Sequence, residues 1–261
     1  WAFMNFTAAG LSDVGLQREH NEDSYCVLSS HRLFVVADGM GGHRAGDIAS
    51  RMATNEISTY FGAAAIDDQP LLNTTNEAGE ALTLDQQRLV AAVKLANQRI
   101  FQASTRNRSV QGMGTTIVGA LFNRDDEEMH VAHVGDSRAY RVRAGGITQL
   151  TRDHSLLNDY LLVMPNLSDA QKERLPNNVI TRALGMQEKV AVDLAVDPVE
   201  SGDVYVLCSD GLNGMVADDR ILDIVHRAGA NVEAAAKELV AEANQNGGED
   251  NVTVVVIRIT E

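Results

Sequence analysis

Short apolar stretches recur along the chain, and most are bounded by Gly, Asp or another polar residue. Stretches of this length that are rich in Val, Ile and Leu are typical of buried β-strands. They predict strands at residues 6–15, 25–28, 33–37, 115–122, 129–134, 139–142, 191–196, 204–208 and 252–259. Because residues 25–28 and 33–37 are so close in the chain, we expect them to form a hairpin.

Other segments place apolar residues three or four positions apart, which predicts amphipathic helices. These segments cover residues 45–61, 89–100, 221–225 and 232–243, and they fall into two pairs. Within the first pair, residues 67–79 are polar and contain Pro70 and Gly79, so we expect a connecting loop there.

The order of these elements favours an α+β fold. Strands are followed by a helix pair, more strands, a second helix pair and a final strand, without the regular alternation of parallel βαβ units. We therefore expect mixed or antiparallel sheets covered by helices. The periodicity breaks down at residues 154–178, which include Pro165 and Pro176, and we interpret this segment as a flap-like, mobile insertion.

Composition limits the size and the partners of the protein. With 261 residues, 44% of them hydrophobic, the chain can bury a large core, and we expect one domain spanning residues 1–261 rather than two small ones. Its 22 basic and 36 acidic residues give a formal net charge of −14. This charge argues against general binding to nucleic acid or to an anionic membrane.

Further features bear on localisation. No apolar run reaches membrane-spanning length and the N-terminus lacks a signal-peptide profile, so no membrane insertion is expected. Cys26 and Cys208 both lie in apolar stretches, where we expect them to pack as small hydrophobic residues in a reducing compartment, the cytoplasm. The chain begins with Trp1 rather than Met, so whether it is a fragment of a longer protein stays open.

Acidic side chains stand at the ends of several predicted strands. Asp38 and Asp210 follow apolar stretches, Asp250 precedes the last one, and Glu22 and Asp23 precede another. Strand ends that share one core can bring these residues together. Several carboxylates at close quarters repel one another unless a cation lies among them. Oxygen ligands without His or Cys favour a hard cation such as Mg²⁺ or Mn²⁺.

Five short motifs occur in an order that resembles a known family. They are Arg18-Glu19-His20-Asn21-Glu22-Asp23, Asp38-Gly39-Met40-Gly41-Gly42-His43, Gly135-Asp136-Ser137-Arg138, Ser209-Asp210-Gly211-Leu212 and Glu249-Asp250-Asn251. Each motif alone is weak, since Asp-Gly pairs are common in turns. Together they resemble the metal-dependent Ser/Thr protein phosphatases of type 2C, in their bacterial branch. The resemblance covers residues 10–259 and implies a β-sandwich of two mainly antiparallel sheets flanked by pairs of α-helices.

The resemblance also implies a role for each motif residue. Asp38 would bridge two metal ions, Glu22 and the carbonyl of Gly39 would bind one of them, and Asp210 and Asp250 would bind the other. Asp23 would orient a metal-bound water, and Arg18 would clamp the phosphate, whose oxygens match the planar guanidinium. Asp136 would hold a third, weaker ion together with Asp210.

The implied activity is hydrolysis of phosphoserine and phosphothreonine in proteins, with Mn²⁺ or Mg²⁺ as cofactor. A metal-bridged water or hydroxide would attack the phosphorus directly, so no phosphoenzyme is needed. Phosphorylated proteins are the expected partners, and the resemblance suggests a Ser/Thr protein kinase as one of them. We expect a monomer.

The general acid stays open. Eukaryotic relatives often carry His after the first Asp-Gly pair, whereas this chain has Met40, which cannot donate a proton. His43 is a candidate proton shuttle, and a surface histidine at the start of a helix is an equal alternative.

Simpler or different interpretations compete with this one. Arg18 could form a surface ion pair with Glu19 or Glu22, the Asp-Gly pairs could be plain turns, and Glu22 and Asp23 could be a solvated acidic pair. An inactive relative that binds phosphoproteins would be expected to lack a metal carboxylate, and none is missing here.

Two further segments are candidates for a nucleophile. Residues 26–32 have the Cys and Arg spacing of a thiolate phosphatase loop, but they contain no glycine to form a phosphate-binding nest. Ser137 lacks the Gly-x-Ser-x-Gly elbow of a hydrolase nucleophile.

Overall fold

The computed structural model describes residues 4–41, 45–62, 81–123, 125, 127–168, 171, 175 and 179–261. The strands are β1 (Asn5–Asp13), β2 (Asp23–Leu28), β3 (Leu33–Met40), β4 (Gly114–Thr115), β5 (Ile117–Asn123), β6 (Glu128–Val134), β7 (Arg138–Arg143), β8 (Gly146–Gln149), β9 (Asp193–Pro198), β10 (Val204–Cys208) and β11 (Val252–Thr260). The helices are α1 (Ala45–Gly62), α2 (Leu84–Arg106), α3 (Leu156–Val163), α5 (Asp210–Asn213), α6 (Asp218–Ala228) and α7 (Val232–Gln245).

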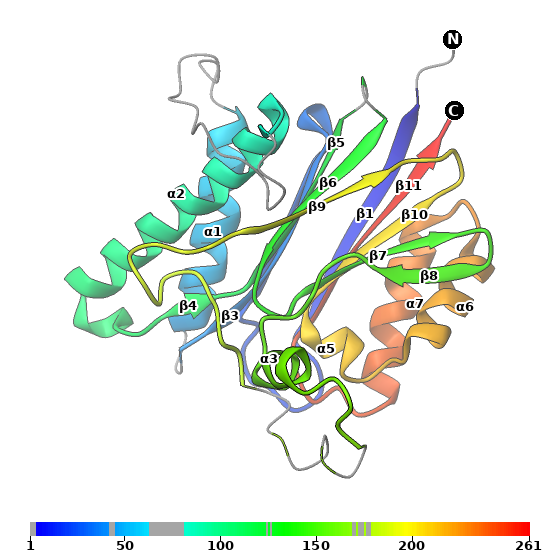
Figure 1. Ribbon diagram of the computed structural model, residues 1–261. Coiled ribbons are helices and arrows are strands. Elements are labelled where there is room, and N and C mark those ends of the chain that lie inside the picture. Colours follow the sequence, from blue (N-terminus) through cyan, green and yellow to red (C-terminus); the bar gives the residue numbers. More distant parts are fainter. Residues whose placement is uncertain are drawn as a thin grey trace.

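The strands form two sheets that pack face to face (Figure 1). One sheet has the order β1-β11-β10-β7-β8, and the other has the order β2-β3-β5-β6-β9, with β4 pairing at the end of β3. Every strand pairing among the described residues is antiparallel. The expected α+β sandwich of mainly antiparallel sheets is therefore confirmed.

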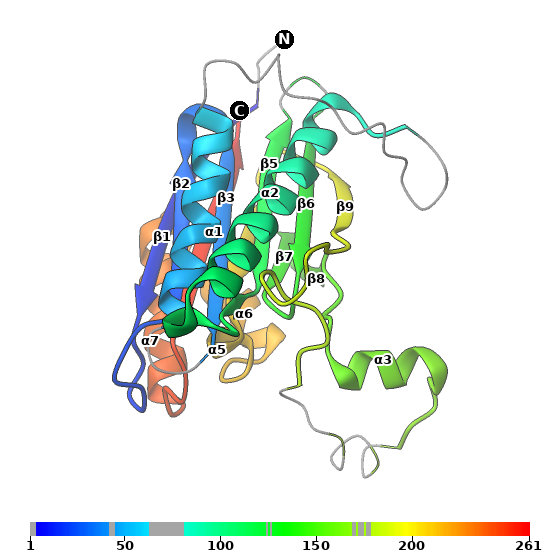
Figure 2. The same cartoon turned by 90° about the vertical axis from the view of Figure 1, so that its left-hand side faces the viewer.

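Helix pairs cover the outer faces of the sandwich. Helices α1 and α2 lie over the sheet that contains β3, and α6 and α7 lie over the sheet that contains β11 (Figures 1 and 2). Residues 33–37 of β3 are all apolar, and their packing explains this pattern. Val35 and Ala37 pack against the first helix pair, whereas Phe34 and Val36 face the other sheet. A strand that is buried on both faces has no polar side to alternate with.

Most predicted elements match the structure, and the differences concern short ones. Strand β8 and helix α5 have four residues each, too few to show a periodic pattern. Helix α3 lies inside the segment interpreted as a flap-like insertion, and none of its residues is buried. The loop expected at residues 67–79 lies outside the described residues.

The described helices include none with the length and apolarity needed to span a membrane.

Candidate metal centre

One end of the sandwich brings the predicted acidic residues together. Asp23 begins β2 and is paired directly with Asp38 of β3, so two carboxylates occupy opposite positions of one ladder. Asp210 starts α5 and is separated from the end of β10 by one residue, and its charge is among the causes that raise the pKa of Asp38. Like charges at such positions destabilise a fold unless a proton or a cation is shared between them.

The Asp-Gly pairs are not the turns that the simpler interpretation assumed. Asp38 and Gly39 lie within β3, and Asp210 and Gly211 lie within α5. A Cβ atom on Gly39 would lie 2.1 Å from the carbonyl oxygen of Gly46, and one on Gly211 would lie 2.0 Å from that of Asn251. Both glycines therefore permit a close backbone approach beside an acidic residue.

Glu22 and Gly39 both approach the first turn of α1. A Cβ atom on Gly46, in the first turn of α1, would lie 2.8 Å from Glu22 Oε2 and 2.8 Å from the carbonyl oxygen of Gly39. Gly39 also donates its N–H to the carbonyl oxygen of Glu22 at 3.1 Å, and Ser50 donates to the same oxygen at 2.6 Å. The structure thus brings together the two oxygen ligands that were expected to share one ion.

Burial raises the pKa of these carboxyl groups. Burial, followed by the charges of Asp23 and Asp210, holds the pKa of Asp38 well above its ordinary value. Burial and the charge of Asp250 raise the pKa of Asp210. Burial is also the main cause that raises the pKa of Asp23 to about 7 and that of Asp136 to about 7. Such values indicate acids that the surrounding protein does not neutralise.

Unpartnered oxygens indicate where a cation fits. Asp23, Asp136 and Asp210 each keep a buried Oδ1 that has no hydrogen-bond partner among the described residues. Buried polar atoms in native proteins are normally paired. Oxygen ligands suit Mg²⁺ and Mn²⁺. The donor set therefore fits divalent cations.

Several residues that the sequence did not single out position the acids. Ser209 donates to Asp23 Oδ2 at 2.7 Å and accepts the N–H of Thr253 at 3.0 Å. Asn251 accepts the N–H of Glu22 at 2.8 Å and donates to the carbonyl oxygens of Val14 and His20. Ser209 and Asn251 directly adjoin Asp210 and Asp250 in their motifs. This adjacency is the sequence signal that could have identified them as positioning residues.

Arg18 reaches the same end of the sandwich. Its Nη2 is 2.6 Å from Asp250 Oδ2, and its side chain is 53% exposed. The ion pair is thus formed with a candidate metal ligand and not with Glu19 or Glu22. Because the guanidinium is exposed, it is accessible to a phosphate group in solution.

A cavity of about 650 Å³ opens beside the carboxylates. Its lining includes Asp136, Asp210 and Asp250, and the start of α3 contributes Leu157 and Asn158. The segment after β8 therefore borders the candidate site. His43 lies outside the described residues, so its role stays a prediction.

The two alternative nucleophiles are in unsuitable surroundings. Cys26 lies in β2 and accepts a hydrogen bond from Ser58, and burial raises the pKa of its thiol, which opposes a reactive thiolate. Ser137 is 1% exposed and bonds to Thr116 at 2.7 Å.

A compact group of residues of the types that bind metal ions lies apart from the predicted carboxylates. Among the described residues, the group of three whose possible ligand atoms all lie within 4.8 Å of one another is His133, His154 and Asp193. The predicted carboxylates do not meet this criterion. No sequence motif had indicated that these three residues lie together.

Comparison with known proteins identifies similar chains. The sequence model described as protein phosphatase 2C matches residues 17–243. The chain is 35% identical over 249 residues to the serine/threonine phosphatase Stp of Listeria welshimeri serovar 6b, covering 94% of this chain and 93% of that protein. It is 37% identical over 258 residues to the protein phosphatase PhpP of Streptococcus pneumoniae serotype 2, covering 96% of each.

A solved structure shows the same architecture. The catalytic domain of the serine threonine protein phosphatase PstP, in complex with two manganese ions, matches with a TM-score of 0.80 and 32% identity. The match covers 99% of this chain and 100% of that chain.

Proposed function

The chain belongs to the protein phosphatase 2C family, and we propose that it hydrolyses phosphoserine and phosphothreonine in proteins with the help of divalent cations. The observation that carries this proposal is the cluster of buried carboxylates with raised pKa values and unpartnered oxygens. The manganese ions of the similar PstP structure support Mn²⁺ as one suitable ion. Mg²⁺ is the alternative for the same oxygen ligands.

The proposed cation ligands are Glu22, Asp38, the carbonyl of Gly39, Asp210 and Asp250, with Asp136 and Asp210 for a third, weaker ion. When bound, such cations lower the pKa of water and offset the charge of the phosphoryl group. We assign the orientation of the attacking water to Asp23, because Ser209 fixes one of its oxygens and leaves Oδ1 available to accept a proton. Arg18 binds the phosphate, and no covalent phosphoenzyme forms.

The test is phosphate release from a phosphothreonine peptide with Mn²⁺, with Mg²⁺ and with EDTA. We expect release with either cation, none in EDTA, and unchanged activity in Cys26→Ser. Full activity in EDTA, or loss of activity in Cys26→Ser alone, would contradict the proposal. Peptide binding without phosphate release at saturating Mn²⁺ would instead identify a non-catalytic phosphoprotein-binding module.

The segment at residues 154–178 is proposed as a flap that contacts protein substrates. Residues 169, 170, 172–174 and 176–178 lie outside the described part of it. Figure 2 shows α3 standing away from the two sheets, and Leu162 and Val163 on it are 57% and 80% exposed. Polar substitutions at these two positions should slow the hydrolysis of phosphoproteins more than that of p-nitrophenyl phosphate. Equal effects on both substrates would exclude a role in substrate selection.

We further propose a cytoplasmic monomer that acts on phosphorylated proteins, with a Ser/Thr protein kinase among its partners. Cys26 and Cys208 are both free thiols, which a reducing compartment preserves.

A further inference from the structure

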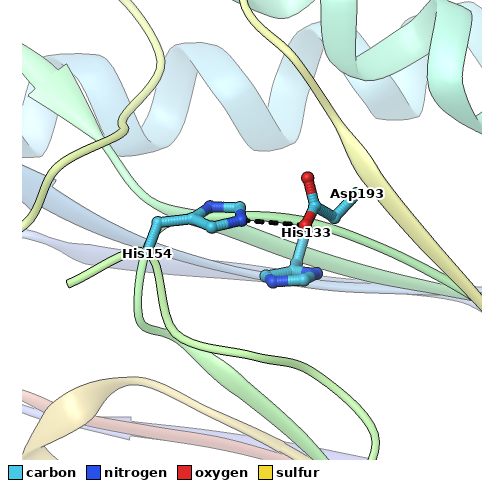
Figure 3. A group of neighbouring side chains, drawn as sticks. All are labelled: His133, His154 and Asp193. Carbon is cyan, nitrogen blue, oxygen red and sulfur yellow. Dashed lines mark ion pairs between the residues drawn. The ribbon is translucent and has the colours of Figure 1, made fainter. Parts of the chain in front are cut away.

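The histidine cluster joins segments that are far apart in the sequence. His133 of β6 and Asp193 of β9 are paired in the strand register, and His154 follows β8 (Figure 3). Both histidines are almost fully buried, with exposures of 4% and 3%. His154 Nε2 is 3.2 Å from Asp193 Oδ2, and the two rings stack with centroids 4.7 Å apart and planes 12° apart.

The geometry of the cluster argues against a metal site. A metal ion lies close to the plane of each imidazole that binds it, and two stacked, nearly parallel rings do not share such a point. His154 Nδ1 accepts the N–H of Gly135 at 3.0 Å, so in the neutral ring Nε2 carries the proton and is not a ligand. The guanidinium of Arg182 already pairs with Asp193. These side chains form a hydrogen-bond network.

His154 bonds to both main-chain polar groups of Gly135, its N–H and its carbonyl oxygen. Besides the bond to Nδ1, the main-chain N–H of His154 donates to the carbonyl oxygen of Gly135 at 2.9 Å. Gly135 has φ +111°, and a Cβ atom there would lie 2.6 Å from Thr116 Cβ, so glycine is required. The next residue is Asp136, whose carboxyl group lines the cavity beside Asp210.

The position of His154 is itself constrained. Because Nδ1 accepts the N–H of Gly135, the proton lies on Nε2, which faces Asp193 Oδ2 at 3.2 Å. Nη1 of Arg182, which itself pairs with Asp193, lies 3.0 Å from the same nitrogen. His133, stacked on the ring, donates its Nε2–H to the carbonyl oxygen of Arg152 at 2.8 Å. Thr181 donates its N–H to the carbonyl oxygen of His154 at 2.8 Å.

We propose that His154 is a positioning residue that orients the turn at Gly135 and, through it, the carboxylate of Asp136, with Asp193 setting the tautomer of the imidazole. The proposal rests on the proposed phosphatase function only in so far as Asp136 serves as a cation ligand. His154 is not among the residues that line the cavity beside the carboxylates, so it acts through Asp136. Partners behind a metal ligand commonly control its orientation and the affinity of the site.

The first test examines the wild-type protein by NMR. The N–H···N bond predicts a scalar coupling between the amide nitrogen of Gly135 and Nδ1 of His154, and ring ¹⁵N shifts that place the proton on Nε2. A missing coupling, or a proton on Nδ1, would overturn the proposal. Because this measurement needs no phosphatase activity, failure of the proposed function would be recognised separately.

The second test compares two polar substitutions of His154. His154→Asn keeps an acceptor where Nδ1 lies, whereas His154→Gln keeps a donor towards Asp193 and loses the acceptor for Gly135. In His154→Gln we expect hydrogen exchange of the Gly135 amide to accelerate about fivefold. The Mn²⁺ concentration for half-maximal binding and for half-maximal activity should rise about tenfold, with KM for the phosphopeptide unchanged.

His154→Asn should remain close to wild type in amide exchange and in Mn²⁺ requirement. The matched control is His130→Gln, which alters a fully buried histidine of β6, the strand of His133, that bonds to Glu128. It should lower stability without changing the exchange of the Gly135 amide. If His154→Asn were as impaired as His154→Gln, or if His154→Gln matched the control in both measurements, the positioning role would be refuted.

Discussion

Buried acidic residues are paired with arginines at one end of β7 and β10, whereas some of those at the other end keep unpartnered oxygens. At the end away from the cavity, Asp203 is 1% exposed and accepts two hydrogen bonds from Arg143, at 2.7 and 2.6 Å. Asp197 there accepts from Arg141 and from Tyr205. At the cavity end, Arg138 is directed to Asp153, while Asp136 and Asp210 retain oxygens without a partner in the described structure.

The difference shows how a fold can reserve a site for ions. Burying an unpaired carboxylate costs free energy of folding. At the end of the sandwich away from the cavity, a guanidinium offsets this cost. At the other end the compensating charge must come from a proton or from a cation in solution. The raised pKa of Asp38 is the electrostatic consequence of that arrangement.

The largest effect is expected for Asp38→Asn at the cavity end. Losing the shared ligand should lower kcat by about a thousandfold or more, since cations supply several kcal/mol of transition-state stabilisation. The metal-free variant should nevertheless be more stable than wild type, because one of several repelling charges is gone. Kinetics at saturating Mn²⁺ and thermal unfolding in EDTA measure the two effects. Turnover near that of wild type would remove Asp38 from the centre.

The matched substitution at the other end is Asp203→Asn. Removing one partner of a buried ion pair should lower the free energy of unfolding by about 3 kcal/mol. Because the two ends are far apart, kcat at saturating Mn²⁺ should stay within about twofold of wild type. Denaturant titration and steady-state kinetics provide the comparison. A loss of kcat similar to that of Asp38→Asn would show that the two ends are coupled.

The metal-free protein should lose stability as the pH rises from about 4 to about 7. Asp23 and Asp136 each have a pKa of about 7 in the folded chain, raised from 3.8 mainly by burial. Between these two pKa values the folded state therefore binds protons that the unfolded state has released. The stabilisation that these protons provide is lost as the pH rises through the raised pKa. Chemical denaturation in EDTA across this range measures the slope.

Two comparisons sharpen the pH experiment. Asp23→Asn should reduce the slope, and saturating Mn²⁺ should abolish it by replacing the protons. Stability that rose with pH in EDTA would mean that these carboxyl groups are already compensated by the protein.

The smallest effect is expected for Arg18→Ala. Its ion pair with Asp250 is largely exposed, so thermal stability should hardly change. Loss of the phosphate contact should raise KM for a phosphopeptide about tenfold while kcat changes less. Arg18→Lys, which keeps the charge without the planar fork, is the control. An unchanged KM in Arg18→Ala would leave this arginine as a surface ion pair.

Local pattern was sufficient for much of the fold. Residues 33–37 and 204–208 are predicted as strands because they are apolar and short. The first segment lies within β3, and the second is β10. Helix α3 was missed because it is exposed, so no core-facing stripe marks it. The boundary of β3 was also missed, since Asp38 and Gly39 interrupt the apolar run but continue the strand.

Sequence alone determined the repertoire of acidic residues and their motifs, because each motif is a few adjacent residues whose chemistry is visible without the fold. Tertiary structure decided which acids are left without a partner, since Arg138 and Arg143 are both arginines of β7 and differ in the end of the sandwich that they reach. It also brought His133, His154 and Asp193 together across strand pairings and a loop. Isolated histidines carry no local signal, because burial and hydrogen-bond partners arise from residues distant in the chain.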